Sequence, residues 1–243
     1  MTEDTWLSSL EHDLYHAIAT DMSELHHAAD IGELQQIGEA PHHPDVLPDG
    51  TPTVIYGNPQ GDAQFNHLQG DNSLGFQEDC GLVSDADILD QFGKNVTEDD
   101  VVQHAVQNGE CYVNPFDPSQ SGGTTAESQA QILKDYGVPA HVKEAGTLDS
   151  LAKDVQDGKG VIIEVNAGVL WNDPSAYQNG QANHAIVVTG VARDPHTGQI
   201  QGFYINDSGD GKSAQFVDAQ TMEQAWVNAG GESVVTDNPV PNQ

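Results

Sequence analysis

The chain has 243 residues, enough for one large domain or two small ones around a buried core. Its 38 aspartates and glutamates against 7 lysines and arginines give a formal net charge of −31 at pH 7, which disfavours nucleic acid and anionic lipid as partners and favours cationic ones. The sequence contains no run of about 18 apolar residues, so it does not predict a membrane-spanning segment. The acidic start lacks the features of a Sec signal peptide, so we expect a cytoplasmic protein or one exported by another route.

The first 52 residues are predicted to be an acidic helical extension followed by a linker. Residues 5–30 place Leu7, Leu10 and Leu14 on one stripe of an amphipathic helix. Residues 39–52 are rich in proline, which disfavours regular structure. We therefore expect the folded domain to span residues 53–243, with the extension either packed on it or covering its cleft as a removable propeptide.

Helices are predicted in the first half of that domain. After a short strand at 53–56, apolar stripes and terminal glycines indicate helices over about 80–93, 97–109, 124–137 and 147–158. The third of these opens with Thr124 and Glu127 in a capping-box pattern.

Strands are predicted in the second half. Apolar runs at 161–165, 184–191, 202–206 and 233–236 indicate four strands, and a short helix is expected at 218–227. Residues 194–198 have hairpin turn chemistry. Helices followed by an antiparallel sheet make an α+β fold.

Cys80 lies where a loop is predicted to turn into a helix. The positive end of the helix dipole favours a thiolate there, and Gly81 leaves room for a substrate backbone. Gln77 offers a side-chain amide that could complete an oxyanion hole with the Cys80 N–H. Cys111 has no such surroundings, and we expect it to be structural.

His184 opens an apolar strand, where its side chain can leave the core and face a cleft. If 184–191 and 202–206 form a hairpin, the exit of the second strand lies beside His184. Asp207 or Asn206 could then orient the imidazole, but neighbouring residues in a strand point to opposite sides, so only one can serve.

Three segments together resemble the papain-like C39 peptidase group: Asp79–Gly81, Asn183–Val191 and Tyr204–Gly209. The resemblance runs in order over roughly residues 70–236. It implies a papain-like fold with N-terminal helices packed on a C-terminal antiparallel sheet. It also implies that Cys80 is the nucleophile, His184 the general base and acid, and Asp207 the orienting carboxylate of a cysteine peptidase.

The chain departs from the family pattern at the oxyanion glutamine. That glutamine usually lies about six residues before the cysteine, where this chain has Leu74. Gln77 is three residues before Cys80, and Asn72 and Gln69 are alternatives.

The resemblance implies hydrolysis of a peptide or isopeptide bond through an acyl-thioenzyme, with a peptide or protein as the substrate. The acidic surface of this chain would favour a substrate with basic segments. This mechanism requires no organic cofactor and no metal. Two alternatives stay open: an amidase, deamidase or transglutaminase-type effector with the same triad, and a catalytically silent acidic binding module. The oligomeric state is not predicted.

Other polar clusters have plainer interpretations. Residues 207–211 could be a turn or a weak Ca²⁺ loop. His12 and His16 have the helical spacing of a two-point zinc clamp but no third ligand, and His26–His27 and His42–His43 are expected to be solvated histidines.

Overall fold

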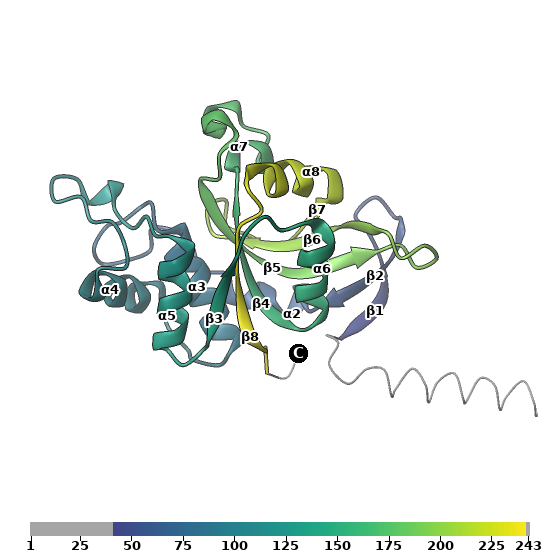
Figure 1. The fold of residues 1–243 in the computed structure, drawn as a ribbon, viewed down its shortest axis with the longest axis horizontal. Coiled ribbons are helices and arrows are strands. Elements are labelled where there is room, and N and C mark those ends of the chain that lie inside the picture. The colour runs from purple at the N-terminus through teal and green to yellow at the C-terminus, as the bar shows by residue number, and fades with distance from the viewer. Residues whose placement is uncertain (1–40, 242–243) are drawn as a thin grey trace, which may run out of the picture. The chain divides into compact units, whose positions relative to one another are not determined.

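The computed structural model describes residues 41–241, which form one sheet with helices on both faces (Figure 1). Within this range the eight strands are β1 (His42–Val46), β2 (Pro52–Gly57), β3 (Ala140–Lys143), β4 (Lys159–Val165), β5 (His184–Arg193), β6 (Ile200–Asp207), β7 (Lys212–Asp218) and β8 (Ser233–Pro239). The α-helices are α2 (Pro59–Asp62), α3 (Cys80–Gln91), α4 (Glu98–Asn108), α5 (Ala126–Asp135), α6 (Leu148–Gln156), α7 (Ala167–Leu170) and α8 (Ala219–Ala225). Short 3₁₀ turns are η1 (Ala63–Phe65), η2 (Pro118–Gln120), η3 (Pro174–Ala176), η4 (Gln178–Gly180) and η5 (Val227–Ala229).

The sheet is antiparallel throughout and has β5 at its centre. Its main order is β1-β2-β5-β4-β8-β3, while β6 pairs with β5 and β7 pairs with β6. The first half of β5 pairs with β4, its second half pairs with β2, and β6 runs along its other edge. β5 is therefore almost fully buried, as its unbroken apolar run predicts.

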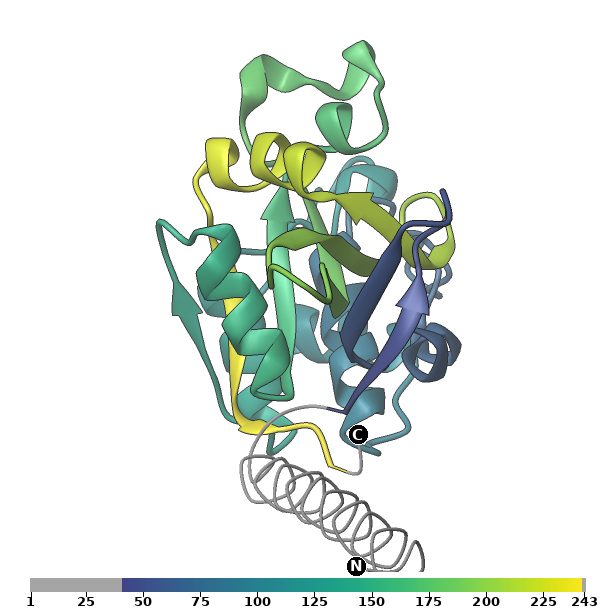
Figure 2. The same cartoon turned by 90° about the vertical axis from the view of Figure 1, so that its right-hand side faces the viewer.

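Two apolar cores lie on the two faces of the sheet. Helices α3, α4 and α5 gather on one side, where Leu82, Ile132 and Val187 are buried (Figure 1). Helices α6 and α8 cover the other face around Trp226 and Phe203 (Figure 2). The predicted α+β arrangement, with helices ahead of an antiparallel sheet, is confirmed.

Local capping explains where the predicted helices begin and end. Thr97 caps α4 in a capping box with Asp100, and Thr147 caps α6. Gly109 after α4 has φ 71°, the left-handed conformation that ends a helix at low steric cost. The prediction for α5 was wrong by one residue: Thr125 is the cap, while the Thr124 hydroxyl donates to the Glu110 carbonyl.

The prediction that residues 39–52 form an irregular linker is wrong for residues 42–46. These residues form β1, which pairs with β2 in the register His42↔Tyr56. Because β1 is the outer strand of the sheet, Pro44 can be accommodated there without breaking a central ladder. Strands β3 and β7 were not predicted from the sequence.

Some predictions lie outside the described residues. These include the helix over 5–30, its possible role as a propeptide, and the histidine pairs His12–His16 and His26–His27. In residues 41–241, no helix combines the length and the apolar character needed to cross a membrane.

Candidate active site

Cys80 is the first residue of α3, at the sheet-facing side of the helical layer. Its cap residue, Asp79, makes no side-chain hydrogen bond to the end of the helix. The first N–H groups of a helix have no partner within it, and the dipole makes that end positive. The partly exposed thiol of Cys80 therefore lies in a field that stabilises negative charge.

His184 is the first residue of β5, and it lies against Cys80. The backbone N–H of the next residue, Ala185, donates to Cys80 Sγ at 3.4 Å. The imidazole is buried, with only 3% of the residue exposed, and it interacts with the Cys80 side chain. The long-range pairing of the α3 start with the β5 start thus brings a thiol and an imidazole together from positions 104 residues apart.

Asp207, the last residue of β6, lies on the far side of the imidazole. Its Oδ1 is 2.7 Å from His184 Nε2 and accepts a hydrogen bond from the Gly209 N–H at 2.9 Å. A carboxylate can only accept, so Nε2 is the protonated ring nitrogen and Nδ1 is left for the thiol proton. This is the tautomer that a base serving Cys80 requires.

Asn206 is turned away from His184. Its Nδ2 donates to the Asp62 carbonyl at 2.9 Å, and its Oδ1 accepts from the Ala214 N–H at 3.1 Å. Of the two orienting residues considered from the sequence, the structure brings Asp207 to the imidazole and uses Asn206 to tie β6 to its neighbours.

The electrostatics of the cluster favour a charged imidazole. Burial alone would lower the pKa of His184, but hydrogen bonds with Asp207 and Cys80, and the negative charge of both, raise the pKa above its usual 6.5. Burial would likewise raise the pKa of Asp207, yet hydrogen bonds from His184, Trp171 and Gly209 lower it. The arrangement can hold a thiolate, an imidazolium and a carboxylate in line.

Trp171 is a part of the site that the sequence analysis did not identify. Its indole Nε1–H donates to Asp207 Oδ2 at 2.7 Å, and its ring lies 4.9 Å from the His184 ring at a tilt of 57°. It covers the His184–Asp207 hydrogen bond on one side. The available signal was a tryptophan in the long segment between two apolar strands.

Gly209 leaves the space that these two rings occupy. A Cβ built on Gly209 would lie 2.9 Å from both His184 Cε1 and Trp171 Cζ2. Real Cβ atoms do not make such contacts, so a larger residue here would displace a ring. Residues 207–211, read from the sequence as a turn or a Ca²⁺ loop, thus form a turn whose first carboxylate is committed to the imidazole.

The side-chain amides proposed for the oxyanion hole all donate to groups of the protein, in the loop before α3 or at the start of α4. Gln77 Nε2 donates to the carbonyls of Phe76 at 3.2 Å and Gly70 at 3.4 Å. Asn72 Nδ2 donates to carboxylate oxygens of Asp79 and Glu98, both at 3.0 Å. Gln69 Nε2 donates to the Gln77 carbonyl.

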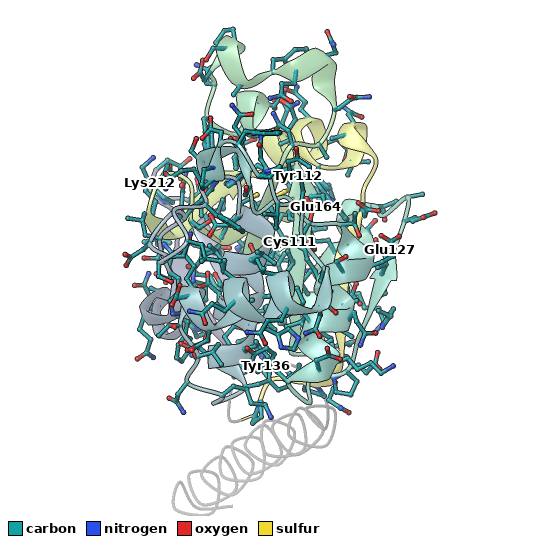
Figure 3. The ribbon with its side chains drawn as sticks, turned by 90° about the vertical axis from the view of Figure 1, so that its left-hand side faces the viewer. Cys111, Tyr112, Glu127, Tyr136, Glu164 and Lys212 are labelled. Carbon is teal, nitrogen blue, oxygen red and sulfur yellow. The ribbon has the colours of Figure 1, made fainter. Side chains whose placement is uncertain are left out.

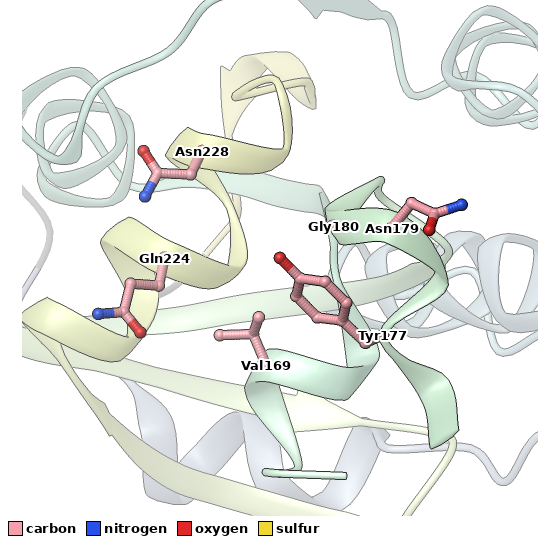
Figure 4. Close-up of a pocket in the computed structure, with 6 residues that line it drawn as sticks. All are labelled: Val169, Tyr177, Asn179, Gly180, Gln224 and Asn228. Atoms are coloured by element: carbon pink, nitrogen blue, oxygen red, sulfur yellow. The ribbon is translucent and has the colours of Figure 1, made fainter. Parts of the chain in front are cut away.

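A pocket of about 390 Å³ lies away from this cluster, between the segment after β4 and α8 (Figure 4). It is lined by Val169, Tyr177, Asn179, Gly180, Gln224 and Asn228. None of these residues contributes to the thiol–imidazole–carboxylate cluster, so the hollow is not where the chemistry described above would occur.

Groups that could bind metal lie elsewhere among the described residues. His104, Glu110 and Asp135 bring one ligand atom each within 4.8 Å of one another, but His104 Nε2 is already 3.1 Å from Asp135 Oδ2 and 3.6 Å from Glu110 Oε2, so direct contacts of the imidazole account for the cluster. His42 stacks on the Tyr56 ring, so it does not pair with His43 around an ion.

Comparisons with known proteins concern the family and the fold of the chain. The model of the Peptidase_C39 like family matches residues 62–234. A putative C39-like peptidase from Bacillus anthracis has a similar structure, with 18% identity, a TM-score of 0.51, and coverage of 73% of this chain and 96% of its own. A double glycine motif protease from an AMS/PCAT transporter, solved with a leader peptide, is 18% identical with a TM-score of 0.44 and coverage of 70% and 89%. No curated protein matches the chain.

Proposed function

Because this chain belongs to the peptidase C39-like family, as its motifs predict, we propose that it is a cysteine peptidase that hydrolyses peptide bonds with Cys80 as nucleophile. The papain-like α+β fold expected from the resemblance is confirmed by its structural neighbour. The observation that supports the proposal most is the continuous chain of contacts from Cys80 through His184 to Asp207.

In the proposed reaction, His184 holds the thiol proton while Cys80 sulfur attacks the scissile carbonyl carbon. The C–N bond then breaks as the imidazolium donates its proton to the leaving amine, which leaves an acyl group on Cys80. Water, deprotonated by the neutral imidazole, attacks the thioester and releases the carboxylic acid and the thiol. Asp207 holds the imidazole in one tautomer and stabilises its positive charge.

We assign the oxyanion hole to the Cys80 N–H and the Gln77 amide. The N–H lies at the positive end of α3, which supports its role. Gln77 would have to exchange its contacts with Gly70 and Phe76 for the substrate oxygen. Removing one such donor typically costs about 10²–10³-fold in kcat.

The proposal is tested by the rate of iodoacetamide alkylation of Cys80 against pH, with each cysteine followed by peptide mass mapping. Burial and the charges of Glu110 and Asp79 raise the pKa of Cys111, which makes it an internal control for an inactive thiol. We expect Cys80 to react well below pH 8 and the His184→Ala variant to react slowly there. Equal reactivity of the two cysteines, unchanged in the variant, would leave the chain as a binding module.

Hydrolysis itself is tested with a mixed peptide library, read by mass spectrometry for new termini. New carboxyl termini that require Cys80 support a peptidase. Conversion of side-chain amides without chain cleavage would instead support the amidase or deamidase alternative.

A further inference from the structure

Glu164 lies on the sheet directly beside the proposed reaction centre. It interrupts the apolar run of β4 and pairs in register with Ala185 of β5, the residue whose N–H contacts Cys80 Sγ. Residues opposite each other in an antiparallel pair point to the same face. Glu164 also shares the face of Ile162, which is buried against α3 and α5, so its carboxylate is directed to the helical layer that holds Cys80.

A second carboxylate accompanies Glu164 on the next strand. The Glu164 N–H donates to the carbonyl of Glu232 at 3.1 Å, just before β8. Burial and the charge of Glu232 raise the pKa of Glu164 to about 7, while His184 and Gln129 act in the opposite direction. Both side chains remain partly exposed, so a solute can reach them.

The helical wall facing Glu164 contains a buried polar side chain. Gln129 of α5 is fully buried, and its Nε2 and Oε1 make no hydrogen bond of good geometry, although the amide acts on Glu164 as a weak hydrogen-bonding neighbour. Its Nε2 lies against Gly81, where a Cβ would be 2.4 Å away, and the amide is near enough to act on Glu164. Buried amides are normally fully hydrogen-bonded, so one that has only this weak contact, beside Cys80, indicates a place for a ligand.

The groups around this space are rich in carboxyl groups. Asp85 of α3 is also fully buried, both of its oxygens lack hydrogen bonds, and Glu164 acts on it. Glu127 and Glu144 act on Glu232 from the outside. Figure 3 looks onto this face and labels Glu164 and Glu127 on it. The missing component is a cationic donor, and an ammonium or guanidinium group supplies three to five N–H donors.

We propose that Glu164, with Glu232 and Gln129, forms a subsite for a lysine or arginine side chain of the peptide substrate. This inference rests on the proposed function, because the acyl group to be transferred must lie on Cys80. Opposed residues on paired strands are about 5 Å apart, and a peptide advances about 3.4 Å per residue, so the basic residue lies within two or three positions of the scissile bond. The substrate preference then comes from one local carboxylate as well as from the overall charge.

The test uses tripeptidyl vinyl sulfones that alkylate Cys80 and carry either lysine or norleucine at the first, second or third position from the electrophile. Norleucine keeps the aliphatic chain and lacks the ammonium group. At pH 8 we expect lysine to react about tenfold faster or more than norleucine at one position, because one charge-assisted hydrogen bond is worth at least that factor. The Glu164→Gln variant, which keeps the size of the side chain, should lose that preference.

A matched control separates the subsite from the general field of the protein. Glu223→Gln removes the same charge from an exposed position on α8 and should keep the lysine preference. Iodoacetamide alkylation of Cys80 is measured in all three proteins, because that reagent does not use the subsite and therefore reports any effect of Glu164 on His184 separately.

The outcomes distinguish the two proposals. Fast iodoacetamide labelling with no lysine preference, or with a preference that survives Glu164→Gln, overturns the subsite and leaves the proposed function standing. Slow iodoacetamide labelling of Cys80 in the unmodified protein overturns the proposed function, and the subsite with it.

Discussion

Replacing Asp207 by asparagine should lower the pKa of His184 and weaken the thiolate of Cys80. The structure gives one buried hydrogen bond of 2.7 Å between Asp207 and His184. A hydrogen bond to a charged group is worth about 1.5–3 kcal/mol. At 1.36 kcal/mol per unit, its loss lowers the pKa of His184 by about 1–2 units.

The expected fall in the pKa of His184 follows from the opposing effects on its imidazole. Burial lowers its pKa, and the interactions with Asp207 and Cys80 overcome that effect. Without the carboxylate charge, the imidazolium is less stable, so less Cys80 is thiolate near neutral pH. If the whole interaction is expressed in the transition state, hydrolysis slows by about 10- to 100-fold.

The assay combines the pH profile of Cys80 alkylation with an NMR titration of the His184 ring. We expect the alkylation midpoint to move toward higher pH while the NMR midpoint moves lower. Asp210→Asn is the control, since it removes an exposed carboxylate three residues away. If Asp207→Asn titrates like the Asp210→Asn control, Asp207 does not govern the imidazole and the reasoning fails.

Three further predictions concern single residues. Trp171→Phe keeps an aromatic ring but loses the indole N–H that donates to Asp207, so kcat/KM should fall about tenfold and the pH profile of Cys80 alkylation should shift. An unchanged pH profile would mean that the indole only fills space. Gly209→Ala should reduce hydrolysis by about tenfold or more, because its Cβ would lie 2.9 Å from the Trp171 ring, whereas Gly123→Ala, with no atom near its Cβ, should be neutral by the same assay. Burial raises the pKa of Asp62 from 3.8 to about 7, so its stabilising effect is complete below pH 3.8 and lost as the pH rises through 7. Between pH 5.5 and 7, the free energy of unfolding of the unmodified protein should therefore fall by about 2 kcal/mol more than that of the Asp62→Asn variant, as measured by urea denaturation. Parallel plots of the free energy of unfolding against pH for the two proteins would contradict this.

The sequence predicted the central strands and missed those at the margins of the sheet. Strands β4 and β5 have continuous apolar runs because neighbours cover both faces. Among residues 41–241, strands β1, β3 and β7 each pair along one side only, and few of their side chains are buried. An edge strand gains much of its stability from backbone pairing with a neighbour, which leaves little trace in its own residues.

The thiol, imidazole and carboxylate could be predicted because each follows from the ends of regular elements. Cys80 begins a helix, His184 begins a strand, and Asp207 ends the strand that pairs with it. Trp171 could not be predicted in the same way. Its contact with Asp207 depends on the path of a loop 36 residues earlier in the chain, and no repeating pattern encodes that path.

Glu164 lies between these two cases and shows what a polar residue in a buried strand can mean. Holding a half-buried carboxylate beside two others costs free energy that a valine or isoleucine at the same position would not, so stability alone does not favour Glu164. The same sheet accepts apolar residues at Ile162 and Val187 on that face. The cost of Glu164 is offset when a cationic side chain enters, and this gives the position a role in binding that its place in the strand would not suggest. A Glu164→Gln protein that is more stable than the unmodified one, yet slower toward lysine-containing probes, would fit this trade of stability for specificity.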